Sequence, residues 1–324
     1  MKAGAPPDRT LSLRAPAKIN LGLRLTGLRA DGYHLLESLF VPLGLADDIE
    51  LRWWREAEPE TALSIEMPAE ARLPKALANV TAGPDNLISR AVEVFRAAHG
   101  LPGRVELRLT KRIPAGAGLG GGSSNAGAVL AALPGLMGEN SSDLPGLALG
   151  LGADVPYFLA PAPALVTGIG EEIASVEHVP PLDVVLANPG FSVATAEVYR
   201  VADVLRDSLT GPEAGSTMRA ISGLAGETGA WRHALGELLV NDLTPAAIRL
   251  CPPIGRWLDR LREANAIGVG MSGSGGTVFG VFENAGQAEQ AAAELKRSSA
   301  STDSDNQTTE DGSWVHVTRV VASH

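Results

Sequence analysis

The stretch 114–127 reads PAGAGLGGGSSNAG and places six glycines and two serines between an apolar strand pattern and an apolar helix pattern. Glycine loses more backbone entropy on folding than any other residue, so such a run is costly unless bare backbone is needed. A flexible linker would not be expected between a patterned strand and an apolar helix. A glycine-rich loop entering a helix presents free N–H groups and the positive end of the helix dipole, which together bind phosphate. We therefore expect a phosphate-binding loop.

Two other glycine motifs fit this stretch poorly. Gly116, Gly118 and Gly121 match the spacing of the dinucleotide-binding fingerprint, but residues 111–114 separate the preceding strand from the first glycine. The acidic residue that this fingerprint needs at the end of a second strand is also missing. The P-loop requires a lysine after its last glycine, whereas here the glycines run directly into Ser123. Both motifs are rejected.

The whole chain has the composition of an ordinary globular protein. It has 324 residues, 45% hydrophobic and 20% charged, which is enough for about two domains. The net charge of -10 disfavours nucleic acid and anionic membranes as partners. A single cysteine, no signal-peptide pattern and no long apolar run favour a cytoplasmic protein. We expect small-molecule partners, with the oligomeric state, monomer or homodimer, left open.

Hydrophobic periodicity predicts mixed strands and helices, typical of an α+β fold. In the first half we expect strands at 19–25, 48–54 and 104–110, a helix capped by Asn86 and ending at His99, and a helix from near Ser124 to Pro134-Gly135. In the second half we expect strands at 184–187, 277–282 and 314–321 and helices from near 195, at 255–264 and at 287–296. We place domains at 1–162 and 163–324, and we expect 298–313 to be a disordered surface insertion.

The glycine-rich stretch resembles the second signature of the GHMP kinases, which hold the phosphates of ATP in such a loop. Two further segments resemble the other motifs of that family: 15–23 (APAKINLGL) and 271–279 (MSGSGGTVF). One branch fits best, on 29–34 (RADGYH), 150–156 (GLGADVP) and 188–190 (NPG). That branch phosphorylates a cytidine diphosphate derivative of methylerythritol for isoprenoid synthesis. The resemblance implies a ribosomal protein S5 domain 2-like N-terminal domain and a ferredoxin-like C-terminal domain.

The resemblance also implies a catalytic pair. Asp154 would be the general base that accepts the proton of the attacking hydroxyl, and Lys18 would stabilise the developing alkoxide. From the residues alone, Lys18 would be a solvated lysine on the polar face of a strand. Asp154 would serve equally well as the N-cap of a helix. The mechanism therefore predicts that these two side chains lie close together in space.

On the nucleotide side, the resemblance implies that the loop and its flanks bind ATP. The implied ATP-binding residues are Lys111, Pro114, Ala115, Gly116, Ala117, Gly118, Leu119, Gly120, Gly121, Gly122, Ser123, Ser124 and Asn125. Lys111 and Asn125 would reach the ribose or the base, and residues 273–275 would support the loop. Mg²⁺ should accompany ATP. No side chain is evident as its ligand beyond the hydroxyls of Ser123 and Ser124, so no protein metal site is predicted.

On the acceptor side, the resemblance implies five substrate-binding residues: Asn20, Tyr33, His34, Thr195 and Tyr199. The rings of Tyr33 and Tyr199 would stack on the two faces of cytosine, and His34 would bind the base edge. Each residue also has an ordinary structural interpretation: a polar strand face for Asn20, a turn tip for Tyr33 and His34, a helix N-cap for Thr195, and core packing for Tyr199. Two alternative functions are a GHMP kinase for another small alcohol, such as homoserine or mevalonate, and a nucleotide sensor without catalysis.

Overall fold

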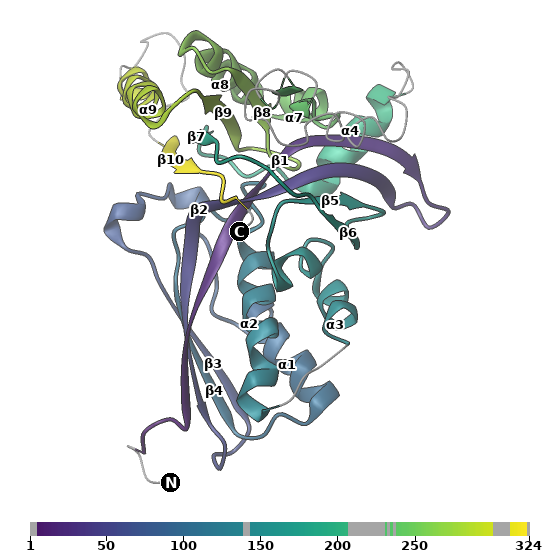
Figure 1. Cartoon of the computed structure of the whole chain (residues 1–324), viewed down its shortest axis with the longest axis vertical. Helices are drawn as coiled ribbons and strands as arrows, with labels where there is room; N and C mark the ends of the chain where they lie inside the picture. The colour runs from purple at the N-terminus through teal and green to yellow at the C-terminus, as the bar shows by residue number, and fades with distance from the viewer. Residues whose placement is uncertain are drawn as a thin grey trace.

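The structure is a computed structural model that describes residues 5–138, 143–206, 231, 234–235, 238–300 and 312–322. Within these residues the chain forms two sheets, each covered by helices (Figure 1). The larger sheet contains β1 (Arg9–Leu28), β2 (His34–Trp54), β3 (Glu60–Glu66), β4 (Arg104–Thr110), β5 (Ala164–Thr167) and β6 (Glu172–Ser175). Its order is β3-β4-β2-β5-β6, with β1 paired to β2. β3 and β4 are parallel and the other pairs are antiparallel.

The hairpin of β1 and β2 is the longest feature of the fold (Figure 1). Its register runs from Arg9 opposite Trp53 to Leu28 opposite His34, with irregularities on either side of Lys18–Asn20. The strand predicted at 19–25 is confirmed, but β1 is much longer than that pattern indicated. The central residues of β1 are buried on both faces of the strand. Its polar side chains in this part therefore also point into the interior of the protein.

Three helices cover one face of the larger sheet (Figure 1). They are α1 (Leu87–His99), α2 (Gly121–Met137) and α3 (Leu144–Leu151), accompanied by the short helices η1 (Ala69–Ala71), η2 (Lys75–Leu77) and η3 (Pro156–Leu159). α1 is confirmed together with its cap, because Asn86 Oδ1 accepts a hydrogen bond from the N–H of Ile88 at 3.0 Å.

The boundaries predicted for the second helix are wrong at both ends. α2 begins at Gly121 rather than near Ser124, and it continues through Pro134 to Met137. Leu133 and Leu136 are buried in the core on either side of Pro134. This packing outweighs the backbone hydrogen bond that the proline removes, and the helix ends instead at the left-handed Gly138.

The smaller sheet contains β7 (Asp183–Asn188), β8 (Gly268–Met271), β9 (Val278–Phe282) and β10 (Trp314–Arg319). Its order, β10-β7-β9-β8, places the strands in the 4-1-3-2 arrangement expected of a ferredoxin-like domain. Its helices are α4 (Thr195–Arg206), α7 (Thr244–Leu250), α8 (Pro253–Glu263) and α9 (Ala285–Ala300). The predicted α+β class is confirmed.

Two predictions about chain organisation need comment. α9 continues to Ala300, so the disordered insertion expected at 298–313 does not begin at 298, and residues 301–311 lie outside the described residues. The domain boundary between 162 and 163 stays a prediction. β5 and β6, which follow it, still belong to the larger sheet through the pairing of β5 with β2.

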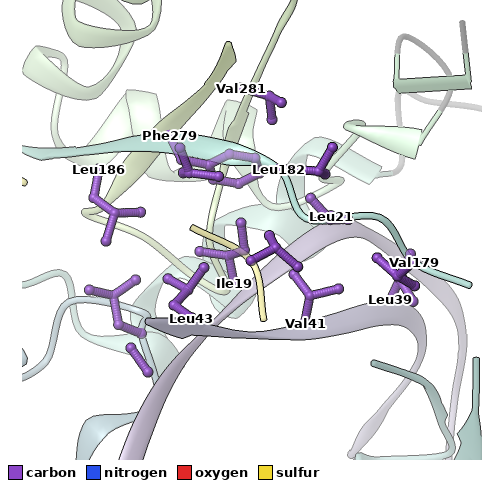
Figure 2. Close-up of a cluster of buried hydrophobic side chains, with 14 of the residues drawn as sticks. Ile19, Leu21, Leu39, Val41, Leu43, Val179, Leu182, Leu186, Phe279 and Val281 are labelled. Carbon is purple, nitrogen blue, oxygen red and sulfur yellow. The ribbon is translucent and has the colours of Figure 1, made fainter. Parts of the chain in front are cut away.

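A hydrophobic core fills the space between the long hairpin and the smaller sheet (Figure 2). Ile19 and Leu21 of β1 lie beneath Phe279 of β9, and all three side chains are fully buried (Figure 2). The alternation of β1 therefore directs its apolar side chains into this core. The polar side chains of Lys18 and Asn20 face the opposite way.

Candidate active site

The glycine-rich loop connects β4 to α2, and its glycines are needed for two physical reasons. Gly118 and Gly120 have φ angles of 77° and 70°, which side-chain-bearing residues rarely adopt. A Cβ on Gly118 would overlap the carbonyl oxygen of Ser272 and lie 2.9 Å from that of Gly275. Ser272 Oγ donates a hydrogen bond to the carbonyl of Gly118 at 2.8 Å. Residues 271–279 therefore pack directly against the loop, as the sequence predicted.

The start of α2 leaves backbone donors available. Its N-cap is Gly120, which has no side chain to cap the helix, and the N–H of Ser124 donates to the carbonyl of Gly120 at 2.8 Å. The N–H groups of 121–123 precede this bond, so they have no acceptor within the helix. Gly122 is exposed there. Free N–H groups at the positive end of a helix form a site for an anion such as phosphate.

Three side chains around this helix start have different surroundings. Ser124 is fully buried and its hydroxyl donates to the carbonyl of Pro16 at 2.7 Å, so it ties α2 to β1. Ser123 is only half-buried. Asn125 is buried, and none of the residues that the structure describes makes a hydrogen bond to its Oδ1. A buried polar atom without a partner is costly.

Lys111 lies beneath the loop rather than in front of it. Its ammonium is buried 2.7 Å from Asp47 Oδ2 and also donates to the carbonyl of Ile113. Asp47 Oδ1 in turn accepts from the backbone N–H groups of Arg112 and Ile113 at 2.6 and 2.8 Å. Burial lowers the pKa of Lys111, and Asp47 opposes that shift. This geometry makes Lys111 a support for the loop, and its contact with the nucleotide stays a prediction.

Lys18 and Asp154 come together as the mechanism requires. Lys18 Nζ lies 3.6 Å from Asp154 Oδ2, and the two side chains are 4% and 33% exposed. Asp154 sits in the turn before η3, whose N-cap is Val155, so it does not cap a helix. The ammonium also lies 4.5 Å from the centre of the Phe40 ring. Sequence reasoning missed Phe40, which appears in the sequence as one apolar residue among many.

Asn20 is the centre of a buried hydrogen-bond network. Its Oδ1 accepts from Lys18 Nζ at 2.8 Å and from the backbone N–H of Gly273 at 2.8 Å. Its Nδ2 donates to Ser38 Oγ at 2.8 Å. These bonds hold Lys18 on one side of Asn20 and the glycine-rich turn at residues 273–275 on the other. Asn20 therefore positions Lys18 whether or not it also touches a substrate.

Asn241 was missed by sequence reasoning. Its side chain also holds the turn at residues 273–275 in place. Its Nδ2 donates to the carbonyls of Met271 and Gly273, both at 2.8 Å, and its Oδ1 accepts from the N–H of Leu243. Nothing in the local pattern around Asn241 points to this function. Its three partners come together only in the folded chain.

Burial shifts the pKa values of Lys18 and of the neighbouring Tyr157. The pKa of Lys18 is lowered because burial disfavours the ammonium, and Asp154 acts in the opposite direction. Burial also raises the pKa of Tyr157, with a smaller contribution from the Asp154 carboxylate. The Tyr157 hydroxyl is buried, and no group in the described part of the chain makes a hydrogen bond to it. The pair is therefore exposed to water chiefly on the side of Asp154.

α4 and the start of β2 form the far wall of the site. The rings of His34 and Tyr199 lie 4.9 Å apart at 37°. Thr195 Oγ1 lies 2.8 Å from Ser274 Oγ, and the carbonyl of Ala194 accepts the first helical N–H groups of α4, so Thr195 is not the N-cap. Tyr33, in contrast, is largely exposed. Burial raises the pKa of Tyr199 to about 12.

One cleft unites most of these groups. It is lined by Lys18, Asn20, Leu23, Leu36, Phe40, Gly118, Gly120, Asp154, Thr195, Tyr199, Gly273 and Ser274. Lys18 and Asp154 thus share a cleft with the glycine-rich loop and with α4. Among the described residues, no group of three or more His, Cys, Asp or Glu side chains could hold a metal ion. Across the same part of the chain, no helix is long and apolar enough to cross a membrane.

Comparison with known proteins agrees with this arrangement. Residues 86–160 match the model of the GHMP kinases N terminal domain, and residues 220–300 match that of the GHMP kinases C terminal. The chain belongs to the GHMP kinases, so the predicted family is confirmed and the protein is a kinase.

Several relatives at about 40% identity carry the name of one branch of that family. A 4-diphosphocytidyl-2-C-methyl-D-erythritol kinase of Anaeromyxobacter sp. (strain K) is 41% identical over 282 residues, which cover 86% of this chain and 82% of the relative. The enzyme of that name from Deinococcus radiodurans is 39% identical over 284 residues, 87% of each chain. A crystal structure of 4-(cytidine 5'-diphospho)-2C-methyl-D-erythritol kinase is 33% identical, covers 96% of this chain and 100% of its own, and superposes with a TM-score of 0.71.

Proposed function

We propose that this protein transfers the γ-phosphate of ATP to the 2-hydroxyl of 4-diphosphocytidyl-2-C-methyl-D-erythritol. The observation that carries this proposal is that the Lys18–Asp154 pair lines one cleft together with the glycine-rich loop and with α4. Such an arrangement holds a phosphoryl donor and an alcohol on opposite sides of one acid–base pair. The names of the relatives at about 40% identity supply the substrate.

In this mechanism Asp154 accepts the proton of the substrate hydroxyl as the bond to phosphorus forms. A positioned general base contributes about 10²- to 10⁴-fold to a rate. Lys18 stabilises the negative charge that develops on the transferred group and the attacking oxygen. Asn20 holds the lysine in place through the 2.8 Å bond to its ammonium.

On the donor side, the N–H groups of 121–123 bind the phosphates of ATP. Their availability, the glycine backbone of the loop and the absence of a capping side chain all support this function. Asn125 then uses its free Oδ1 toward the nucleotide. Lys111 contributes indirectly, because its ion pair with Asp47 holds the loop from below.

Mg²⁺ accompanies ATP in this proposal. Mg²⁺ keeps several waters and is commonly bound by one or two protein oxygens together with phosphates. The donor set fits that mode, since the partly exposed Asp154 carboxylate and the half-buried Ser123 hydroxyl would be two protein oxygens able to hold the ion. Ser124 fits less well, because its hydroxyl already donates to Pro16. The ion supplies neutralisation of phosphate charge.

On the acceptor side, Tyr199 and His34 recognise the cytosine, and Thr195 lies between that subsite and the phosphate loop. Tyr33 would join them by placing its exposed ring on the other face of the base, since aromatic rings stack on bases in this way. Homoserine and mevalonate carry no base, so this wall favours the cytidine compound over them. A cytoplasmic location is proposed with the same activity, and the single cysteine is consistent with it.

The test is ADP release in a coupled assay with ATP and Mg²⁺, comparing the cytidine compound with mevalonate and homoserine. Turnover of the cytidine compound alone, lost in Asp154→Ala, supports both the substrate and the base. Turnover of a different alcohol would retain the family and overturn the substrate assignment. Tight ATP binding without turnover of any alcohol would favour a nucleotide sensor.

A further inference from the structure

One face of α4 carries a row of three polar side chains. Thr195, Tyr199 and Asp203 follow each other at intervals of four residues, which places them on the same side of the helix. Thr195 and Tyr199 line the cleft. Asp203 is the next member of the row, one turn further along, and the mechanism above gives it no function.

Asp203 contacts the histidine that faces this helix. Its Oδ1 lies 2.7 Å from His34 Nε2, and the His34 side chain is only 10% exposed whereas that of Asp203 is 52% exposed. Tyr199 approaches the same imidazole ring at 4.9 Å. The imidazole is therefore held by an aromatic ring and a hydrated carboxylate that both come from α4. The part of the chain that the structure describes provides no hydrogen bond to His34 Nδ1.

This contact determines which ring nitrogen carries the proton. A carboxylate accepts hydrogen bonds and does not donate them, so Nε2 must be the donor. In a neutral imidazole the other nitrogen is then an acceptor, because the hydrogen bond made by one nitrogen sets the tautomer of the ring. When the ring is neutral, Nδ1 of His34 is thus left as a hydrogen-bond acceptor, and the ring that carries it lies near Tyr199.

We propose that Asp203 is a positioning residue that fixes the Nε2–H tautomer of His34 and thereby makes this subsite select cytosine over uracil. The proposal rests on the function proposed above. Cytosine presents its exocyclic amine as a donor, whereas uracil presents a carbonyl oxygen at the same place. Nδ1 accepts a hydrogen bond from the amine of cytosine. Facing the carbonyl oxygen of uracil, it would be one acceptor against another, so the two lone pairs would repel.

The alternative is an ordinary surface ion pair, which would have little influence on binding. α4 itself provides a matched control, because Glu197 pairs with Arg200 at 2.9 Å on an exposed part of the same helix. Glu197→Gln removes a surface carboxylate of α4 without touching His34. An effect seen in Asp203 variants but not in Glu197→Gln is therefore specific to the histidine contact.

The first experiment measures the ¹⁵N chemical shifts of the His34 ring in the ligand-free protein. The wild type and Glu197→Gln should both show the neutral Nε2–H tautomer. Asp203→Ala should show a mixture of the two tautomers, and Asp203→Asn an intermediate state, since an amide oxygen still accepts. A wild-type ring that is an imidazolium or protonated at Nδ1, or a tautomer unchanged in Asp203→Ala, would overturn the proposal.

The second experiment measures base preference with CDP and UDP as binding probes, using calorimetry. Wild type should bind CDP at least about tenfold more tightly than UDP, because an unmatched polar edge is strongly penalised. Asp203→Ala should reduce that ratio at least fivefold, mainly through weaker CDP binding, and Asp203→Asn should retain part of it. An unchanged ratio in Asp203→Ala would contradict the proposal.

The two proposals fail in distinguishable ways. If the wild type prefers CDP but phosphorylates a different alcohol, the proposed reaction fails and the function of Asp203 stands. If the cytidine substrate is phosphorylated, then Asp203→Ala should raise its KM with kcat within about twofold. A loss of kcat at unchanged KM would assign Asp203 to the phosphoryl-transfer step instead and overturn its role in base selection.

Discussion

Lys18 Nζ lies 3.6 Å from Asp154 Oδ2, and this pair connects β1 to the turn that leads into η3. The lysine is buried and the carboxylate is partly exposed. The two charges are therefore unequal in their access to water, and the carboxylate opposes the lowering of the pKa of Lys18 that burial causes. Their contributions to turnover, proton binding and stability can be separated by experiment.

Replacing the proposed base should abolish turnover but not ATP binding. We expect Asp154→Asn to lower kcat at least about a hundredfold, since the proton of the acceptor hydroxyl loses its acceptor. ATP affinity should change only a few-fold, because the N–H groups of α2 are unaffected. Steady-state kinetics and calorimetry measure the two effects. Asp259→Asn, which alters a surface pair with Arg262, is the control. Full activity in Asp154→Asn would exclude Asp154 as the base.

As the pH rises, turnover should decline at a pH below the pKa of a free lysine. Burial lowers the pKa of Lys18 from 10.5, so the ammonium is lost earlier as the pH rises. A ¹³C NMR titration of the Lys18 side chain measures this directly. In Asp154→Asn the pKa should be lower still, because the carboxylate that opposes the shift is gone. An equal or higher pKa in that variant would show that the two side chains are not coupled.

Lys18→Met should stabilise the protein while inactivating it. Between the lowered pKa of the folded state and 10.5, the unfolded chain binds more protons, so stability rises with pH in that window. Below the window the full cost of burying the ammonium is present. Asp154 is partly exposed to water, unlike Asp47 beside Lys111. Asn20 Oδ1 keeps its bond from the N–H of Gly273. Removing the buried ammonium should thus raise the free energy of unfolding at pH 7 by about 1 kcal/mol. Denaturant unfolding tests this, and destabilisation by more than about 1 kcal/mol would contradict it.

Gly118→Ala should destabilise the phosphate loop. The added Cβ would overlap the carbonyl of Ser272, and the φ of 77° is unfavourable for alanine. We expect a loss of about 2–4 kcal/mol in unfolding free energy and a raised KM for ATP. Gly135→Ala is the matched control, because Gly135 lies in α2 with open space around it. This substitution should raise the free energy of unfolding by about 0.5–1 kcal/mol. Equal stabilities of the two variants would contradict the close approach of the loop to Ser272.

Lys111→Met should affect ATP binding more than the chemical step. It leaves Asp47 as a buried charge without its ammonium partner, which costs about 3–5 kcal/mol when one partner of a buried pair is removed. The loop above should loosen, so KM for ATP rises while kcat at saturation changes little. The measurement compares ATP with ATP lacking its ribose hydroxyls. A selective loss of affinity for ATP itself would restore Lys111 as a ribose contact.

Local patterns predicted the elements that local physics controls. Asn86 caps α1 as expected, since a cap depends on neighbours in sequence. The glycine run marks the phosphate loop for the same reason, because backbone conformation at Gly118 is a local requirement. The length of β1 was underestimated, because its pairing with β2 depends on partners far along the chain.

The site was only partly accessible to such reasoning. Lys111 looked like a nucleotide ligand, and its burial against Asp47 depends on how β2 passes beneath the loop. Asn241 gave no signal, since its partners are backbone carbonyls of a distant turn. Asp203 resembles any solvated carboxylate on a helix until His34 is placed opposite it. Side chains whose function depends on a distant partner are the ones that a sequence pattern does not identify.

The long hairpin has a consequence for the inheritance of this fold. β1 carries Lys18 and Asn20 on one face, and on the other it supplies Ile19 and Leu21 to the core beneath β9. The two sheets of the protein therefore share the β1–β2 hairpin as a common structural element instead of being joined only by a linker. Neither half could be exchanged with another protein as an independent module, because the donor would have to replace Lys18 in the cleft and the opposing core together.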